Sequence, residues 1–146
     1  MDALWTHLDP VIAFLGSEAD LSQPAAVRDA LTDRFGDLAD LRRLCRENIT
    51  LLCPREAGAT RFGRLAKDRG GFSVDAVVSS GAGMKHTHPA GEVNFAFALE
   101  GEPRFDGDAP GWIVYGPDTT HPANVEGGTM FMIYLLPQGQ IVWHRE

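Results

Sequence analysis

From residue 60 onward the sequence breaks into short runs with β-type composition, and this pattern limits the possible fold more than any other feature. Turns rich in Gly, Asp and Pro separate the runs, which cover residues 60–67, 72–79, 93–99, 112–115, 129–136 and 140–144. Many short strands joined by turns are typical of a β-sandwich or a barrel. We therefore expect a mainly β domain over residues 55–146.

Residues 1–54 follow a different period. Apolar side chains recur every three or four positions from residue 2 to 15, from 24 to 35 and from 38 to 45, which predicts three amphipathic helices. Pro24 in a first turn and Gly36 after a last turn mark the ends of the middle helix. Because each helix is apolar on one side only, we expect the segment to pack on the barrel or on a partner subunit.

Composition limits the expected partners and the expected cellular location of the protein. The length of 146 residues favours one compact domain, and the net charge of −7 argues against binding nucleic acid. No apolar run approaches the ~20 residues of a membrane helix, so we expect no membrane partner. The N-terminus does not resemble a signal peptide, and Cys45 and Cys53 match no metal-binding spacing. A cytoplasmic protein with reduced thiols is expected.

One stretch carries the candidate chemistry. His86 and His88 lie two residues apart in an extended segment, so both imidazoles point to the same side. The turn at residues 89–91 reverses the chain, and Glu92 returns toward them, while His121 follows much later in a turn rich in Gly, Pro and Thr. Three imidazoles and one carboxylate suit one divalent transition metal (Fe, Mn, Co, Ni, Cu or Zn) and leave coordination positions open.

The strand after this turn has two different faces. By the two-residue period, Glu92 and Asn94 share one face with small alanines, and the residues between them form a bulky apolar face. The first face leaves space in front of Glu92, and the second needs a cover. Asn94 is a candidate to orient the carboxylate, with a plain hydrogen-bonded strand residue as the alternative.

These residues resemble the motifs of the cupin superfamily. The first cupin motif reads H-x-H, three or four residues, Glu, and later Gly; residues 86–88, Glu92 and Gly101 occupy these places. The second motif is matched by Gly111, Pro117, His121 and Asn124, without the Gly expected between the Pro and the His. The resemblance covers about residues 60–146 and implies a double-stranded β-helix, the jelly-roll barrel, with His86, His88, Glu92 and His121 as metal ligands.

A narrower resemblance spans most of the chain. The sequences at residues 86–92, 97–107 and 110–115 are similar to those of small cupins related to 4-hydroxylaminobenzoate lyase. This resemblance implies a carbon–nitrogen lyase of nitroaromatic breakdown, which converts 4-hydroxylaminobenzoate to 3,4-dihydroxybenzoate and ammonia. The implied partner is a small aromatic acid, and we also expect a homodimer.

The substrate carboxylate requires a cationic partner, for which arginine is the usual choice. In a regular strand Arg61 and Arg64 face opposite sides, and Arg64 shares its face with Phe62. We therefore predict Arg64 as the carboxylate ligand and rank Arg104, in an expected loop, second. Surface charge is the alternative for each arginine.

The other expected roles concern the reaction itself. Glu92 and His121 are the candidate catalytic residues, and Glu92 is either a firm metal ligand or the base that activates water. Tyr115 is a candidate to stack on the substrate ring, with core packing as the alternative.

Two further functions remain open from the sequence. The same ligands serve an iron-dependent cupin dioxygenase, which oxygen consumption would reveal. They also serve a non-catalytic cupin that binds a small molecule or a metal.

Overall fold

The computed structural model describes residues 2–144, so residues 1, 145 and 146 of the predicted domain ranges lie outside it. Four helices precede nine strands. The helices are α1 (Asp2–Ser17), α2 (Pro24–Phe35), α3 (Ala39–Glu47) and α4 (Ile49–Leu52). The strands are β1 (Arg55–Ala57), β2 (Thr60–Arg69), β3 (Phe72–Ser79), β4 (His86–His88), β5 (Glu92–Phe105), β6 (Gly111–Tyr115), β7 (Thr119–His121), β8 (Val125–Pro137) and β9 (Val142–Trp143).

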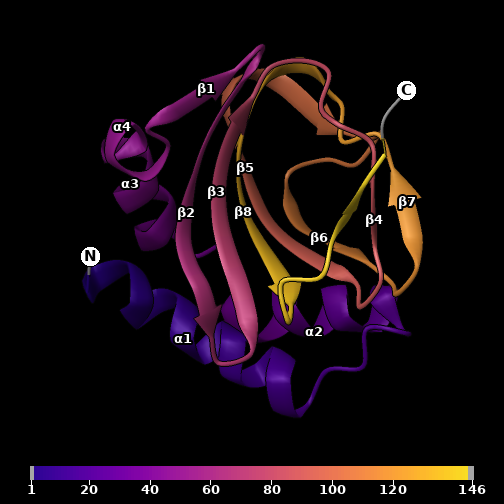
Figure 1. Ribbon diagram of the computed structural model, residues 1–146. Coiled ribbons are helices and arrows are strands. Elements are labelled where there is room, and N and C mark those ends of the chain that lie inside the picture. The colour runs from indigo at the N-terminus through magenta and orange to yellow at the C-terminus, as the bar shows by residue number, and fades with distance from the viewer. Residues whose placement is uncertain (1, 145–146) are drawn as a thin grey trace.

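The strands form two antiparallel sheets that face each other. The larger sheet has the order β1-β2-β3-β8-β5-β6, and the smaller has the order β7-β4-β9. In Figure 1 the larger sheet curves through the middle of the molecule and the smaller one closes its right-hand side. This jelly roll with an N-terminal helical segment confirms the predicted mainly β, cupin-type fold class.

Several strands are longer than the sequence predicted. Strand β5 continues to Phe105, past Gly101, whose φ of 68° and neighbouring register shifts mark an irregularity that interrupts the period. Strand β8 begins at Val125, four residues before the predicted run. Strands β1 and β7 have three residues each and were not predicted as strands, because a two-residue period cannot be recognised over so short a length. Strand β4, also of three residues, corresponds to the extended segment predicted for His86 and His88.

The helices cover the outer face of the larger sheet. The apolar stripe of α1, with Leu8, Val11 and Leu15, shares one buried cluster with the outward side chains of β5, which include Val93 and Phe95. The alternation predicted for β5 is confirmed, because Ala96 belongs instead to a second cluster inside the barrel. Covering one face with helices leaves the other free to build a site.

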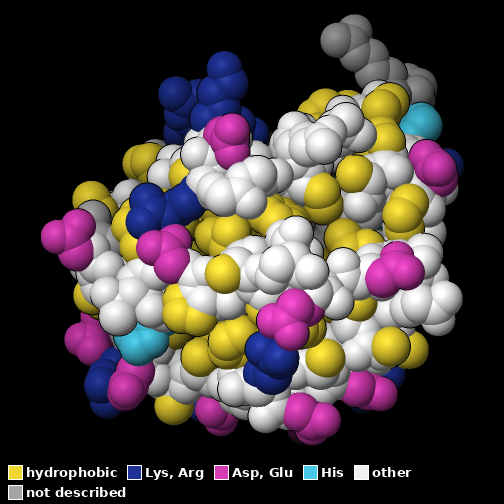
Figure 2. All heavy atoms as spheres, turned by 90° about the horizontal axis from the view of Figure 1, so that it is seen from below, with side chains coloured by type: hydrophobic (Ala, Val, Ile, Leu, Met, Phe, Trp, Pro, Cys, Tyr) yellow, Lys and Arg dark blue, Asp and Glu magenta, His cyan; other side chains and the backbone are white. Residues whose placement is uncertain are grey.

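Polar contacts fix the helices in place. Arg69 at the end of β2 donates two hydrogen bonds to Asp9 of α1, at 2.7 and 2.8 Å, and its guanidinium lies 4.0 Å from the centre of the Trp5 ring. The indole of Trp112 in β6 donates to the carbonyl of Gly36 after α2, at 2.9 Å. Within residues 2–144, every helix is too short or too polar to cross a bilayer. The face formed by α1 and α2 carries acidic and basic side chains around scattered apolar ones (Figure 2).

Gly63 in β2 tests how closely the helical segment sits on the sheet. A Cβ at this position would lie 2.1 Å from the carbonyl oxygen of Leu52 and 2.8 Å from Pro54, so the segment after α4 would have to move. We expect Gly63→Ala to lower the free energy of unfolding by about 1–3 kcal/mol, as overpacking does elsewhere.

Urea denaturation followed by circular dichroism measures this cost. The control is Gly16→Ala, where a Cβ meets only ordinary contacts at 3.8 and 3.9 Å. Equal stability of the Gly63 and Gly16 variants would show that the helical segment is not held against β2 as described.

Candidate metal centre

Strand β4 and its turn bring the two motif histidines to one point. Strand β4 lies between β7 and β9, and His86 is the direct cross-strand partner of His121. The turn after His88 ends at Gly91, whose φ is 97° and whose Cβ position would meet Leu21 at 2.9 Å. Glycine is required here both for the backbone conformation and for the close packing of the turn. Glu92 then starts β5 on the inner face.

The four predicted ligands converge. One ligand atom from each of His86, His88, Glu92 and His121 lies within 4.8 Å of all the others. The Nε2 atoms of His86, His88 and His121 lie 2.9, 3.8 and 3.3 Å from oxygens of Glu92. All four residues are buried, with Glu92 and His88 fully excluded from solvent. His121, which matches the cupin motif least well, therefore joins the cluster with the other three.

The outward nitrogens of the histidines determine which ring nitrogen carries the proton. His86 Nδ1 lies 3.0 Å from the carbonyl oxygen of Met84, which can only accept, so Nδ1 donates. Thr119 gives its hydroxyl proton to the Gly116 carbonyl, so it accepts from His88 Nδ1 at 2.9 Å. His121 Nδ1 donates to the carboxylate of Asp106. A neutral ring that donates from Nδ1 can use Nε2 only as an acceptor, so the inward nitrogens are available to a cation; His86 Nε2 lies within hydrogen-bond distance of Glu92 Oε1, at 2.9 Å.

Burial and the neighbouring groups shift the pKa values of these side chains in opposite directions. Burial lowers the pKa of His88 to about 4, although the Glu92 carboxylate opposes this shift. Burial would also lower the pKa of His121, but the carboxylates of Glu92 and Asp106 raise it above the usual value. Burial would raise the pKa of Glu92, but the neighbouring imidazoles of His121 and His86 bring it down to about 2. Glu92 is thus a carboxylate at neutral pH.

This donor set fits a divalent cation. Three imidazole Nε2 atoms and a carboxylate converge in a buried space, and among them the Nε2 atoms of His88 and His121 have no hydrogen-bond partner. Such a group of acceptors is costly to bury unless a proton or a cation lies among them. Neutral imidazole and carboxylate are ligands of Fe, Mn, Co, Ni, Cu and Zn alike, so the cluster can hold one of these metals without identifying it.

Neighbouring side chains hold the ligands. Asn94 donates to Glu92 Oε2 at 2.7 Å, a contact that agrees with both interpretations of Asn94 and holds one oxygen of the carboxylate. Tyr115 stacks on the His121 ring, with centres 4.2 Å apart and planes 20° apart. Trp143 of β9 packs edge-on against His86, with centres 5.2 Å apart.

Arg64 lies at the end of a row of polar residues that starts at the centre. Asn94, Tyr134, Asp75 and Arg64 are successive cross-strand partners on β5, β8, β3 and β2, so their side chains share the inner face. We call these four residues the polar row. Arg64 Nε donates to Asp75 Oδ1 at 2.8 Å, and the arginine side chain is half-exposed.

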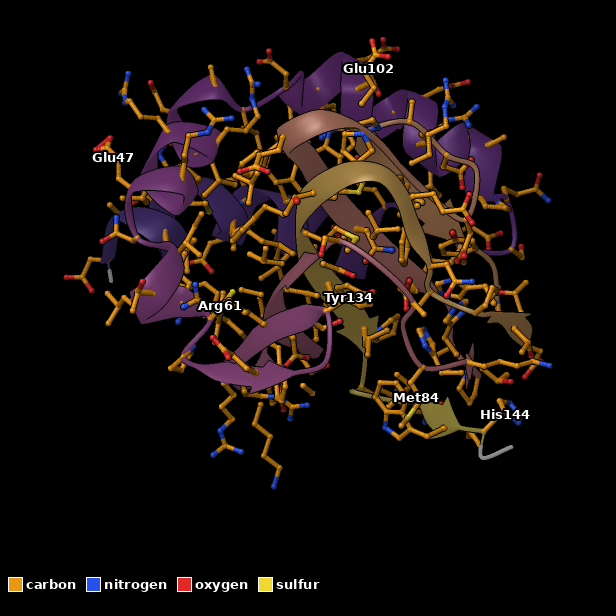
Figure 3. All side chains as sticks on the ribbon, turned by 90° about the horizontal axis from the view of Figure 1, so that it is seen from above. Glu47, Arg61, Met84, Glu102, Tyr134 and His144 are labelled. Carbon is orange, nitrogen blue, oxygen red and sulfur yellow. The ribbon has the colours of Figure 1, made fainter. Side chains whose placement is uncertain are left out.

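The other predicted arginines lie elsewhere. Arg61 faces the helices and donates to the carbonyl of Cys53, so Arg61 and Arg64 do lie on opposite faces. Figure 3 looks into the barrel and shows Tyr134 between the sheets and Arg61 beside the helical segment. Arg104 is in β5 rather than in a loop, donates to the carbonyl of Gly107, and lines a surface crevice beside Asp106.

Sequence reasoning missed two residues of this region. The sequence pattern places Tyr134 in the β-type run of residues 129–136 and gives it no role at the site, yet it lies on the inner face, and burial and the Glu92 charge raise the pKa of its hydroxyl well above the usual value. The hydroxyl therefore stays protonated and available as a donor. Asp106 falls in one of the turns between the predicted strands, which gave it no role either. The available signal was its place just after β5, but the contact with His121 depends on pairing far along the chain.

A jelly roll that gathers an H-x-H pair, a glutamate and a distant histidine at one buried point defines the cupin class. More specifically, the chain belongs to the 4-hydroxylaminobenzoate lyase family, whose family model matches residues 11–143. No protein among those with curated descriptions matches the sequence.

Solved structures with a similar fold are distant. A protein proposed to be an acetylacetone dioxygenase from Methylibium petroleiphilum PM1 and an RmlC-like cupin from Ralstonia eutropha JMP134 each share 15% identity, with a TM-score of 0.44. The matches cover 59% and 62% of this chain, and 66% and 62% of theirs. A cupin-like protein from Thermotoga maritima MSB8 shares 17% identity over 58% of this chain and 75% of its own, with a TM-score of 0.36.

Removal of one ligand tests the centre. We expect His88→Ala to bind a divalent metal at least about 100-fold more weakly than the unchanged protein, since even residues that only support a ligand contribute 10–100-fold. The measurement is a competition titration of metal-free protein against a chromophoric chelator, together with elemental analysis.

The matched control is His144→Ala, because His144 is exposed and contacts Thr87 outside the cluster. Retention of one tightly bound metal by the His88 variant would place the metal site elsewhere.

Proposed function

We propose that this protein is a metal-dependent lyase that converts 4-hydroxylaminobenzoate, or a related hydroxylamino-aromatic acid, to 3,4-dihydroxybenzoate with release of ammonia. The single observation that carries the proposal is the buried convergence of four acceptors with every Nδ1–H turned outward. Membership of the 4-hydroxylaminobenzoate lyase family supports the choice of reaction.

The proposed reaction needs no external oxidant or reductant. The N–O bond breaks with loss of hydroxide, water adds to the ring carbon beside the nitrogen-bearing carbon, and hydrolysis of the resulting imine releases ammonia. The net change is the addition of one water. A divalent metal held by His86, His88, Glu92 and His121 would supply Lewis acidity toward the departing or attacking oxygen.

The state of Glu92 favours a ligand role over a base role. A general base works best when its pKa lies near the working pH. The pKa of Glu92 lies at about 2, because the effect of the neighbouring imidazoles outweighs that of burial, and one carboxylate oxygen already accepts from Asn94. We therefore assign Glu92 and His121 to holding the metal, and Asn94 to keeping Glu92 in place.

The polar row sets the proposed orientation of the substrate between the metal ligands and Arg64. About 14 Å of strand spacing separates Asn94 from Arg64, a span that a long arginine side chain and one aromatic ring can fill together. Arg64 gives only Nε to Asp75, so its two terminal nitrogens remain for a carboxylate. In this arrangement the hydroxylamino end lies at the metal ligands, and the ring passes the protonated Tyr134 hydroxyl.

Tyr115 and Arg104 are weaker candidates in this arrangement. The Tyr115 ring already stacks on His121, so it reaches the substrate only beside that ligand. Arg104 is already bound to a carbonyl at the edge of the crevice.

A direct assay tests the reaction. We expect purified protein to form 3,4-dihydroxybenzoate and ammonia in equal amounts from 4-hydroxylaminobenzoate, without oxygen uptake. Liquid chromatography, an ammonia assay and an oxygen electrode measure the three quantities. Activity should fall at least about 100-fold after chelation and return when metal is added back, since the ligands alone lack the Lewis acid.

Two results would reject the proposal. Oxygen uptake equal to product formation would identify a dioxygenase. A protein with one metal bound and no turnover of hydroxylamino-aromatic acids would be a binding protein.

Substrates with and without a carboxylate test the proposed role of Arg64. We expect Arg64→Ala to raise KM for 4-hydroxylaminobenzoate by roughly 10-fold to 1000-fold, or ~1.4–4 kcal/mol, because the substrate carboxylate loses its cationic partner. The analogue phenylhydroxylamine, which lacks the carboxylate, should be affected far less.

Arg104→Ala is the matched control, since Arg104 lies outside the polar row and should leave KM unchanged. Equal losses on both substrates for Arg64→Ala would show that Arg64 supports the fold instead of recognising the acid.

A further inference from the structure

We infer that Trp143 of β9 binds the aromatic ring of the substrate at the edge of the barrel, and thereby selects aromatic acids over saturated ones. The identity of the substrate rests on the function proposed above, but contact between Trp143 and an aromatic acid can be measured without any turnover.

Strand pairing turns the indole toward the metal centre. Trp143 is the direct cross-strand partner of His86, and directly opposed residues of an antiparallel pair place their side chains on the same face of the sheet. His86 is buried and directs Nε2 at Glu92, so this face is the inner one. The two rings accordingly meet edge to face, with centres 5.2 Å apart and planes 66° apart. Trp143 therefore belongs to the inner wall beside the candidate ligands.

The indole is nevertheless open to solvent. Trp143 is 54% exposed, although its partner His86 is only 1% exposed. Strand β9 is an edge of the smaller sheet, whose order is β7-β4-β9. The backbone N–H of His144 donates to the carbonyl of Lys85 at 3.0 Å, which holds this edge against the segment before β4. In Figure 3 the edge, marked by His144, lies away from the helices. An inner-wall indole that solvent reaches shows that the barrel is open here, next to the candidate ligands.

The other aromatic neighbours of the ligands have no such surface. Tyr115 is already stacked on His121, and Phe105 is fully buried against the same ring. Among the aromatic side chains of residues 2–144 that contact the three histidines, only Trp143 is exposed. Covering an exposed indole with a second flat ring buries apolar surface and adds the attraction between two aromatic rings. Trp143 is therefore the aromatic side chain that is free to contact a ligand.

The position of Trp143 agrees with the substrate orientation proposed above. The polar row lies on the larger sheet, and Trp143 lies on the smaller sheet that faces it. A ring that extends from the candidate ligands along the polar row can thus have the Tyr134 side of the larger sheet on one face and the indole on the other. A saturated ring has no flat face for the indole, so the contact favours aromatic acids.

Contact quenching tests the inference directly. The probe is 4-nitrobenzoate, which has the ring and the carboxylate of the proposed substrate and whose nitro group quenches an indole that it touches. We expect saturable quenching of tryptophan emission, in metal-free protein and in protein loaded with Zn²⁺. Trp143→Phe should abolish the quenching but not the binding, which isothermal titration calorimetry follows. Trp5→Phe is the control and should keep the quenching, since Trp5 lies on α1 beside Arg69.

The strength of binding gives a second readout. We expect Trp143→Ala to raise the Kd of 4-nitrobenzoate, and KM for 4-hydroxylaminobenzoate, by about 5–50-fold with little change in kcat, because the ring loses its aromatic contact. Trp143→Phe should recover most of the affinity. Trp143→Ala should also remove most of the preference for benzoate over cyclohexanecarboxylate, measured by competition with 4-nitrobenzoate.

Val142→Ala is the matched control. Val142 is 49% exposed on the same strand, but it pairs with Thr87, so its side chain lies on the outer face. This substitution should leave the quenching, the Kd values and KM unchanged.

The inference is overturned if the unchanged protein shows no saturable quenching, if the quenching persists in Trp143→Phe, or if Trp143→Ala binds 4-nitrobenzoate as tightly as before. A loss of Zn²⁺ affinity or a change of oligomeric state in Trp143→Ala, without a higher Kd for the probe, would also overturn it. The indole would then only support His86 or form a subunit contact. Saturable quenching of Trp143 in a protein without turnover would reject the lyase reaction alone.

Discussion

The structure depends on a cluster of candidate metal-ligand atoms buried inside the barrel. Three imidazole nitrogens and a carboxylate meet there, and the Nδ1 atom of each ring has a hydrogen-bond partner outside the cluster. In isolation such a cluster is unfavourable, because each acceptor loses its hydration and repels the others. It becomes favourable when a cation occupies the middle, and this explains why so many surrounding groups are devoted to holding the rings in one orientation.

The fold supplies the rigidity that this cluster needs. The ligands come from β4, the start of β5 and the end of β7, and β4 is paired on both sides. The larger sheet is supported in turn by α1 and α2, which cover its outer face with leucine, valine and phenylalanine contacts. The helical segment, although distant from the chemistry in sequence, therefore belongs to the support of the centre.

Much of this arrangement could be predicted from the chain. The helices follow from their period, and the four ligands follow from the H-x-H pair, the glutamate after a turn and a late histidine. Asp106 and the link between Arg64 and Asp75 could not be predicted, because both depend on which strands pair and in what register. Local patterns carry no information on pairing between residues 11 or more positions apart, and a three-residue strand such as β7 has too few residues to show a period.

The strict alternation in the first part of β5, from Glu92 to Phe97, has a consequence for how this sequence can vary. Glu92 and Asn94 serve the centre, while Val93 between them is buried under the helices. A slip of one residue in pairing would place valine among the ligands and a carboxylate in the apolar layer. Residues that serve the metal centre and residues that pack under the helices thus alternate along one strand. An insertion or deletion within this stretch would exchange the two faces of the strand and disrupt the centre. New substrate preferences therefore have to arise from substitutions at every second position or from the neighbouring strands.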